Sequence, residues 1–245
     1  QAKVGGTEMG RGQDVPQVPD QAATGHHRGQ GSQHEGLLRV GVDQVVGARE
    51  PGKRRDRAPD GADRFLSLDD YINGYLDRCV DVLRERHGVD AINLLGICQG
   101  GAFSLCYTAL HPDKVKNLVT MVTPVDFHTP DNMLSHWVRE LDIDLFVDTL
   151  GNVPADLMNW CYLTLKPMRL FQQKYVGLID VLDDKTEVEN FLRMENWIFD
   201  SPDQAGEAFR QFLKDFYQGN KLLKGGLEIG GHAVDLKNIR QPVLN

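Results

Sequence analysis

The stretch Ala91–Gly101 reads AINLLGICQGG, and it decides the fold. It opens with the apolar run AINLL, which is suited to a short buried strand. After the glycine-rich turn, an apolar helix is predicted from about Gln99 to Leu110. A second buried strand, Leu118–Val122, is closed by Pro124. The order strand, helix, strand indicates parallel strands joined by a crossover helix.

The turn itself has the spacing G-x-C-x-G, a nucleophile-elbow pattern with Cys98 in the place of serine. Side chains two positions before and two after the nucleophile would collide with neighbouring backbone, and Gly96 and Gly100 have none. The turn would place the Cys98 sulfur at a helix N-terminus, where partial positive charge favours a thiolate. The backbone N–H of Gln99 would then donate to an oxyanion. The structural alternative is a buried cysteine that acts as a small hydrophobic residue.

Start and stop signals in the sequence predict the helix that precedes this unit. Ser67 followed by Asp70 is a capping-box-like start, apolar residues then recur at helical spacing to Leu83, and Gly88 is the stop signal. After the second strand, residues 131–218 show helical periodicity with no strong strand. The predicted helices there are Asn132–Thr149, Ala155–Leu165, Met168–Val181, Glu187–Trp197 and Pro202–Tyr217.

The last of these helices has its own start and stop signals. Ser201 is the predicted N-cap, Pro202 the first position, Gln204 the partner in a capping box, and Gly219 follows the end. We interpret the block 131–218 as a lid or cap inserted between sheet strands. A packed helical subdomain with no gating role is the alternative, and the pattern does not separate the two.

Composition excludes several classes of protein. The chain has 245 residues and a formal net charge of −8, which disfavours nucleic acid and anionic membranes as partners. No apolar run approaches the roughly 18–20 residues of a membrane span, and no signal-peptide pattern is present. Four cysteines do not make a disulfide framework, so a cytoplasmic location is expected. No spacing of His, Cys or Asp matches a metal site.

The composition changes near residue 59. Residues 1–58 contain no aromatic residue, and their apolar residues are mostly scattered valines. We interpret this segment as disordered, with LLRVGVDQVV (37–46) as the one part able to form a strand or two. A second hypothesis is that residues 1–58 are translated in a shifted reading frame. Residues 59–245 are predicted to be a partial α/β catalytic domain.

From about Pro59 to Asn245 the chain resembles the catalytic subunit of class III polyhydroxyalkanoate synthases. The segments that carry the resemblance include INLLGICQGGAFSL, ALHPDKVKNLVTMVTPVDFHTPDN, FLRMENWIFDSPDQAGEAFRQFLKDFYQ and VDLKNIRQPVLN. The resemblance implies an α/β-hydrolase-like parallel sheet with a mostly helical lid, incomplete at both ends. It also implies a transferase that polymerises (R)-3-hydroxyacyl-CoA, typically 3-hydroxybutyryl-CoA, into polyester, with Cys98 carrying the acyl group.

The same resemblance implies the partners. These are hydroxyacyl-CoA, the growing polyester chain, a second copy in a homodimer and a non-catalytic companion subunit, at polyester storage granules in the cytoplasm. No cofactor is expected, because CoA is a leaving group of the substrate. In the family the catalytic Asp and His follow the strand that begins at Pro242, so both are expected beyond Asn245.

The histidines and remaining cysteines that the chain does contain are given structural interpretations. Gly230-Gly231-His232 imitates the sequence around the family's base, but its neighbours match a segment before the last strand, so we reject His232. His87 and His111 lie at predicted helix ends, and His128 and His136 are interpreted as lid surface. Cys79, Cys106 and Cys161 are interpreted as inert core thiols.

Two other functions remain open. One is a cysteine-dependent thioesterase or hydrolase of the same fold, with water as the acyl acceptor. The other is a non-enzymatic, granule-associated protein that keeps the elbow as a relic.

Overall fold

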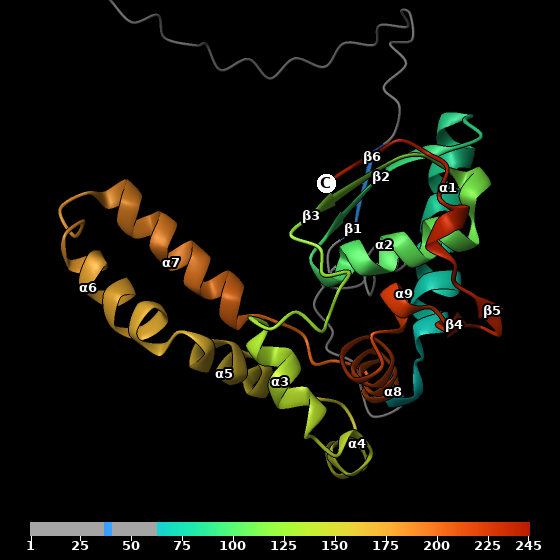
Figure 1. Cartoon of the computed structure of the whole chain (residues 1–245). Coiled ribbons are helices and arrows are strands. Elements are labelled where there is room, and N and C mark those ends of the chain that lie inside the picture. Colours follow the sequence, from blue (N-terminus) through green and yellow to red (C-terminus); the bar gives the residue numbers. More distant parts are fainter. Residues whose placement is uncertain (1–36, 41–62) are drawn as a thin grey trace, which may run out of the picture. The chain divides into compact units, whose positions relative to one another are not determined.

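The computed structural model describes the strand β1 (Leu37–Val40) and residues 63–245. The described strands form a parallel sheet in the order β1-β2-β3-β6, with β2 at Ile92–Ile97, β3 at Val115–Met121 and β6 at Val243–Leu244. Figure 1 shows α2 (Gln99–Leu110) connecting β2 to β3 and lying against them. The predicted strand–helix–strand unit and its parallel pairing are confirmed.

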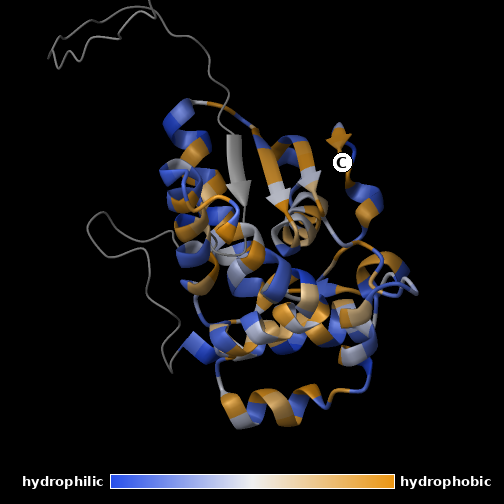
Figure 2. Ribbon diagram, turned by 90° about the vertical axis from the view of Figure 1, so that its left-hand side faces the viewer, coloured by the Kyte–Doolittle hydropathy of each residue, from blue (hydrophilic) through white to orange (hydrophobic). Residues whose placement is uncertain are grey.

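The sheet core is apolar, as the strand sequences predict. Leu94 of β2 pairs with Leu118 of β3, and both side chains are fully buried. In Figure 2 these two strands are largely coloured as hydrophobic. Residues Gly100–Ala109 of α2 are all buried, because this helix packs on the sheet and also contacts the helix that starts at Asp70. A helix covered on every side needs no polar face, which explains its apolar sequence.

The predicted helix before β2 is confirmed, together with both of its end signals. The Ser67 N–H donates to Oδ2 of Asp70 (2.8 Å), and the Asp70 N–H donates to Oγ of Ser67 (3.3 Å), which is a reciprocal capping box. A π-helical stretch, Asp70–Leu76, continues into α1 (Asp77–His87). Gly88 then adopts a left-handed conformation with φ of 62° and ends the helix.

The block after β3 is helical, and two of its five predicted helices differ from the structure by more than two residues. Its elements are α3 (Met133–Arg139), α4 (Ile143–Leu150), α5 (Ala155–Leu165), a π-helical stretch (Met168–Gln173), α6 (Lys174–Ile179) and α7 (Lys185–Phe199). The single helix predicted over Asn132–Thr149 is wrong. The chain breaks at Glu140, because Oδ1 of Asp142 accepts the N–H of Leu145 (3.0 Å) and starts α4 anew.

The predicted start of the last helix of the block is also wrong. This helix begins at Gly206, as α8 (Gly206–Gln211), and continues as a π-helical stretch (Phe212–Gln218) before Gly219. The residues expected to cap it are used elsewhere. Oγ of Ser201 donates to the carbonyl oxygen of Ile198 (2.9 Å), and Gln204 forms an antiparallel bridge with Val153. Oδ1 of Asp203, between them, accepts the N–H of Ala155 (2.9 Å). These pairings close the base of the segment 155–203, and a local reading of the sequence could not reveal them.

The chain returns to the sheet through short elements. These are α9 (Lys221–Lys224), the hairpin β4 (Glu228–Ile229) and β5 (His232–Ala233), and a 3-10 turn (Leu236–Asn238) before β6. Two further 3-10 turns lie at Asp63–Phe65 and Pro112–Lys114. The predicted disorder or frame shift of residues 1–58 lies outside the described residues, apart from β1. The strand interpretation of 37–46 is confirmed for β1.

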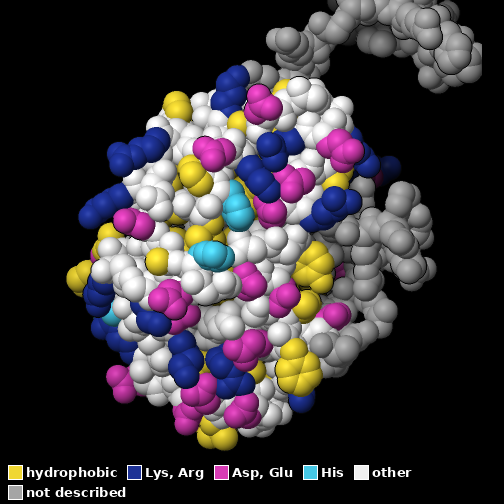
Figure 3. Space-filling view, turned by 90° about the vertical axis from the view of Figure 1, so that its right-hand side faces the viewer, with side chains coloured by type: hydrophobic (Ala, Val, Ile, Leu, Met, Phe, Trp, Pro, Cys, Tyr) yellow, Lys and Arg dark blue, Asp and Glu magenta, His cyan; other side chains and the backbone are white. Residues whose placement is uncertain are grey.

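The surface is uneven in character. Figure 3, which views the face that carries α1 and α9, shows acidic and basic side chains interspersed with isolated hydrophobic ones. The helices α5 to α7 instead expose many large apolar side chains, including Trp160, Met168, Ile179, Leu192, Met194 and Trp197. We call these six residues the α5–α7 apolar surface. Within the described residues, no helix has the length and apolar character that crossing a membrane requires.

Candidate active site

Cys98 occupies the turn between β2 and α2 in a backbone conformation that a residue with a side chain rarely adopts. Its φ is 53° and its ψ is −123°. Its N–H donates to the carbonyl oxygen of Met121 (2.9 Å), and its own carbonyl oxygen accepts the N–H of Gly101 (2.9 Å). The side chain is exposed. A strained turn held from both sides, with a thiol at its tip, is the geometry of a presented nucleophile.

Glycine is required at two positions around this turn. A Cβ on Gly96 would lie 2.6 Å from Oγ of Ser104 and 2.6 Å from Cα of Gly101, which is the crowding that the spacing predicts. Sequence reasoning missed Gly101 itself, where a Cβ would overlap the side chain of Thr123. The pair of adjacent glycines, Gly100 and Gly101, could have indicated that position 101 also requires glycine. Gly100 is buried in the first turn of α2, and its expected role stays a prediction.

Gln99 is the first residue of α2. The first N–H groups of a helix have no acceptor within the helix, and none of the described residues accepts the N–H of Gln99. The group is therefore free to donate to an oxygen that forms beside Cys98, where the helix dipole also favours negative charge.

Two tyrosines of the helical block are electrostatically coupled to the same thiol. Tyr162 of α5 and Tyr217, next to the end of the π-helical stretch after α8, both interact electrostatically with Cys98, and they interact with each other. Burial raises the pKa of Tyr162, and the Cys98 and Cys161 thiols raise it further. Burial also raises the pKa of Tyr217, and Tyr162 and Cys98 add to that shift. Both phenols are thus proton donors, not bases, near neutral pH.

Nothing in the sequence spacing indicated the two tyrosines. They lie far from Cys98 along the chain and on helices whose packing is fixed by long-range pairing. Trp or Tyr residues in an amphipathic helix are ordinarily core residues, so their type alone gave no signal.

Three of the described histidines hydrogen-bond with groups other than the thiol. Nε2 of His111 is 2.7 Å from Oδ1 of Asn73, and Nε2 of His136 donates to the carbonyl oxygen of Pro130 (2.9 Å). Nε2 of His128 donates to the carbonyl oxygen of Tyr217 (2.9 Å). His87 ends α1. None of these histidines hydrogen-bonds with Cys98.

His232 belongs to a tight hairpin. Gly230 and Gly231, with φ of 59° and 76°, form the turn between β4 and β5, and Ile229 pairs with His232. The positive φ angles of this turn explain why two glycines precede His232. Of the other thiols, Cys106 is fully buried and burial raises its pKa, whereas Cys79 and Cys161 are half-buried.

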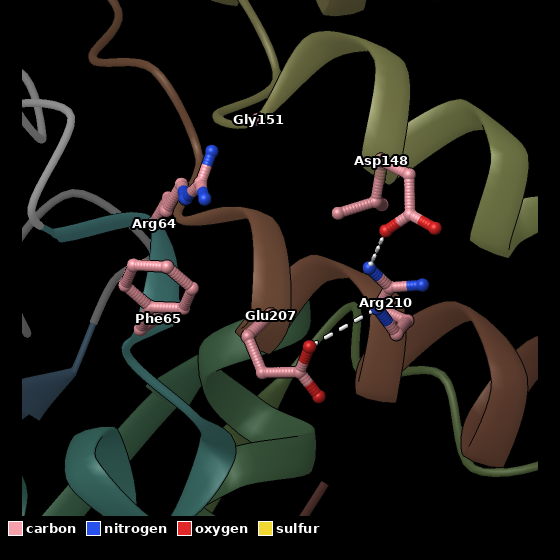
Figure 4. Close-up of a pocket in the computed structure, with 7 residues that line it drawn as sticks. Arg64, Phe65, Asp148, Gly151, Glu207 and Arg210 are labelled. Atoms are coloured by element: carbon pink, nitrogen blue, oxygen red, sulfur yellow. Dashed lines mark hydrogen bonds and ion pairs between the residues drawn. The ribbon is translucent and has the colours of Figure 1, made fainter.

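A small pocket among the described residues lies apart from the thiol. It has a volume of about 120 Å³ and is lined by Arg64, Phe65, Val147, Asp148, Gly151, Glu207 and Arg210. Figure 4 shows Arg210 between the carboxylates of Asp148 and Glu207. Its volume is well below the roughly 300–1,000 Å³ of small-molecule sites. No group of three or more His, Cys, Asp or Glu that could hold a metal occurs in the described part of the chain.

The comparisons with known proteins agree with this geometry. A family model described as alpha/beta hydrolase fold matches residues 28–244. The chain belongs to the alpha/beta hydrolase family. The predicted fold class is confirmed, and the match begins within the segment 1–58 that the sequence set apart.

This alpha/beta hydrolase is also similar to polymerase subunits. It is 72% identical over 187 residues to the poly(3-hydroxyalkanoate) polymerase subunit PhaC of Allochromatium vinosum, over 76% of this chain and 53% of that protein. It is 67% identical to the subunit of the same name from Thiocystis violacea, with the same coverage. Identity to the Synechocystis subunit is 54% over 193 residues, or 76% of this chain and 51% of that protein. The chain spans about half the length of these curated relatives, and the predicted family resemblance is confirmed.

Proposed function

We propose that this chain carries the acyl-binding nucleophile of a polyester polymerase, which joins (R)-3-hydroxyacyl groups and releases CoA. The substrate used to test the proposal is 3-hydroxybutyryl-CoA. The observation that carries the proposal is the exposed Cys98 thiol on its strained turn beside the free N–H of Gln99. The names of the similar proteins support the substrate class.

The first chemical step is an exchange of thioesters. The Cys98 thiolate attacks the carbonyl carbon of hydroxyacyl-CoA, and the resulting oxyanion accepts the Gln99 N–H. The bond from carbon to the CoA sulfur breaks, and CoA leaves as a thiolate that takes a proton from water. Because one thioester replaces another, the acyl group on Cys98 stays reactive. An ester of serine would be more stable and would transfer its acyl group less readily.

The second step forms the ester. The hydroxyl of another hydroxyacyl group attacks the thioester on Cys98, its proton passes to a general base, and the Cys98 sulfur leaves. We place that base outside the described residues, because none of the described histidines hydrogen-bonds with Cys98. The role needs no cofactor, since the acyl group arrives activated by CoA.

The partners follow from the same role. We place the contact with a second copy of the chain in a homodimer on α5 to α7, where large apolar side chains are exposed. A companion subunit and a cytoplasmic location at polyester granules complete the proposal.

The test uses the protein that the gene encodes, purified from a bacterium that makes no polyester. We expect chloroform-soluble polyester when 3-hydroxybutyryl-CoA is supplied, and none with Cys98→Ala, with Cys106→Ala as the matched control. Free 3-hydroxybutyrate in place of polymer would identify a thioesterase. Unchanged polymer with Cys98→Ala would refute the role of the thiol.

A further inference from the structure

Asn220 ties the end of the helical block to the loop after β3. It lies just before α9, is almost completely buried, and has a left-handed backbone with φ of 49°. Its Oδ1 accepts the N–H of Phe127 (3.0 Å), and its Nδ2 donates to Oδ1 of Asp126 (2.7 Å). Its own N–H donates to the carbonyl oxygen of Phe216 (3.0 Å). One amide group thus fixes a loop that lies 93 residues earlier in the chain.

The other end of the same loop supports the nucleophile. The carbonyl oxygen of Met121 accepts the N–H of Cys98 (2.9 Å) and Oγ1 of Thr123 (3.2 Å). The six residues 122–127 therefore span the distance between the turn of Cys98 and the side chain of Asn220. A segment this short, held at both ends, has little freedom to change its backbone angles.

Val122, the first residue of this loop, has a φ of 46°. Positive φ is unfavourable for a β-branched residue and persists only where the surroundings impose it. The Val122 side chain is 79% exposed, so its packing does not impose that conformation. Because Ile97 and Met121 are partners in the sheet register, Val122 and Cys98 occupy equivalent positions at the ends of β3 and β2. Two strained residues are thus neighbours at the carboxyl edge of the sheet.

We propose that Asn220 is a positioning residue for Cys98. By fixing the far end of the loop, it keeps Val122 in its strained conformation and the Met121 carbonyl group on the N–H of Cys98. Without this tie, Val122 relaxes and turns the peptide group that it shares with Met121. Cys98 and the N–H of Gln99 then lose their alignment with the acyl carbonyl group. The inference rests on the proposed function, since the reaction concerned is acyl transfer to Cys98.

The test compares two reactions of Cys98 in the protein that the gene encodes. One is the release of CoA from 3-hydroxybutyryl-CoA, which needs the thiol and the Gln99 N–H in alignment. The other is alkylation by iodoacetamide, which needs only an exposed thiol. Asn220→Gly removes the amide and tolerates the left-handed backbone. The control is Asn159→Ala, which removes a bond from Nδ2 to the carbonyl oxygen of Ile198 (3.2 Å) between α5 and α7.

Asn220→Gly should slow CoA release by roughly 10- to 100-fold and leave the alkylation of Cys98 nearly unchanged. Asn159→Ala should change neither rate. Equal slowing of both reactions would give Asn220 a purely structural role and overturn the inference. Circular dichroism checks the fold. If Asn220→Gly does not fold, Asp126→Ala removes the same tie from the exposed loop side, and the same two outcomes decide.

A double variant tests whether the strain of Val122 is what Asn220 opposes. Val122→Gly removes the strain, so adding Asn220→Gly should slow CoA release less in this background than in wild type. An equal loss in both backgrounds would overturn the inference. If the wild-type protein releases no CoA, the proposed function fails and this inference fails with it. If Asn220→Gly releases CoA at the wild-type rate, the function stands and only this inference is wrong.

Discussion

Gly101 of α2 and Thr123 of the loop after β3 are in contact at a point where a side chain on the glycine does not fit. Oγ1 of Thr123 donates to the carbonyl oxygen of Met121 (3.2 Å), which also accepts the N–H of Cys98 (2.9 Å). The loop and the turn are therefore joined through the Met121 carbonyl group, and α2 is joined to the turn because the Gly101 N–H donates to the carbonyl oxygen of Cys98 (2.9 Å). Thr123 packs against Gly101 at the start of this helix.

Gly101→Ala should lower the free energy of unfolding by roughly 1–3 kcal/mol, because the added methyl group overpacks a buried contact. Urea unfolding measures the loss. The control is Gly177→Ala on α6, where a Cβ meets nothing within 4 Å. That change should be neutral or stabilising, since alanine favours helix more than glycine does. Equal stability of wild type and Gly101→Ala would contradict the crowding.

Cys98→Gly should be more stable than Cys98→Ala by about 1 kcal/mol, because a positive φ is strained for alanine and not for glycine. Both variants lack the sulfur, so their difference isolates the backbone strain. Thermal or urea unfolding of the pair provides the measurement. If Cys98→Ala proves as stable as Cys98→Gly, the turn is not strained in the way that its φ indicates.

The rates at which the thiols of the folded protein are alkylated test whether Cys98 is exposed and reactive. Iodoacetamide should modify the exposed Cys98 at least about tenfold faster than the buried Cys106, whose raised pKa also disfavours the thiolate. Peptide mass spectrometry assigns the sites over time. Similar slow rates at Cys98 and Cys106 would favour the interpretation of the elbow as a relic.

Local signals in the sequence predicted the elements that hold the thiol, because those elements depend on neighbouring residues. The run before Cys98 forms β2, the reciprocal bonds of Ser67 and Asp70 start a helix, and Gly88 stops it. Each of these features is decided within a few positions of the chain. The parallel pairing of β2 and β3 followed from the short crossover through α2.

Features that depend on distant residues could not be predicted. Gln204 looked like part of a helix cap, yet it pairs with Val153, and α8 starts later as a result. The electrostatic influence of Cys98 on Tyr162 and Tyr217 likewise depends on how the helical block folds. These long-range features were thus missed, whereas the turn that carries the thiol was found.

Arg210 joins α8 to α4 through separate carboxylates. Its guanidinium donates to Asp144 and Asp148 (both 2.6 Å) and to Glu207 (3.0 Å), and these pairs raise its pKa further. Arg210→Lys should lower the urea midpoint, because one ammonium cannot reach all three groups. The loss should shrink in 1 M salt, where ion pairs are screened. Lys185→Met, which removes an exposed pair with Glu189, is the control and should change little. An equal loss at low and high salt would assign the effect to packing.

His111 makes the stability of the fold depend on pH. Its imidazole stacks on Tyr107, with centroids 4.8 Å apart, and Nε2 lies 2.7 Å from Oδ1 of Asn73. Burial lowers the pKa of His111. Asp77 and Asp81 oppose that shift, whereas Lys114 and His232 add to it. The folded chain therefore favours the neutral ring, and the unfolded chain takes up the proton first as the pH falls through about 6.5.

The free energy of unfolding should accordingly fall between pH 7.5 and pH 5.5, and His111→Gln should make that fall smaller. Above the unfolded-state pKa both states hold the neutral ring, so the histidine adds no pH dependence there. Urea unfolding at several pH values measures the slope, and circular dichroism at pH 7.5 checks that the variant folds. The carboxylate pairs titrate at lower pH and leave this window unaffected. A variant slope equal to or steeper than that of wild type would show that the fold does not favour the neutral ring of His111.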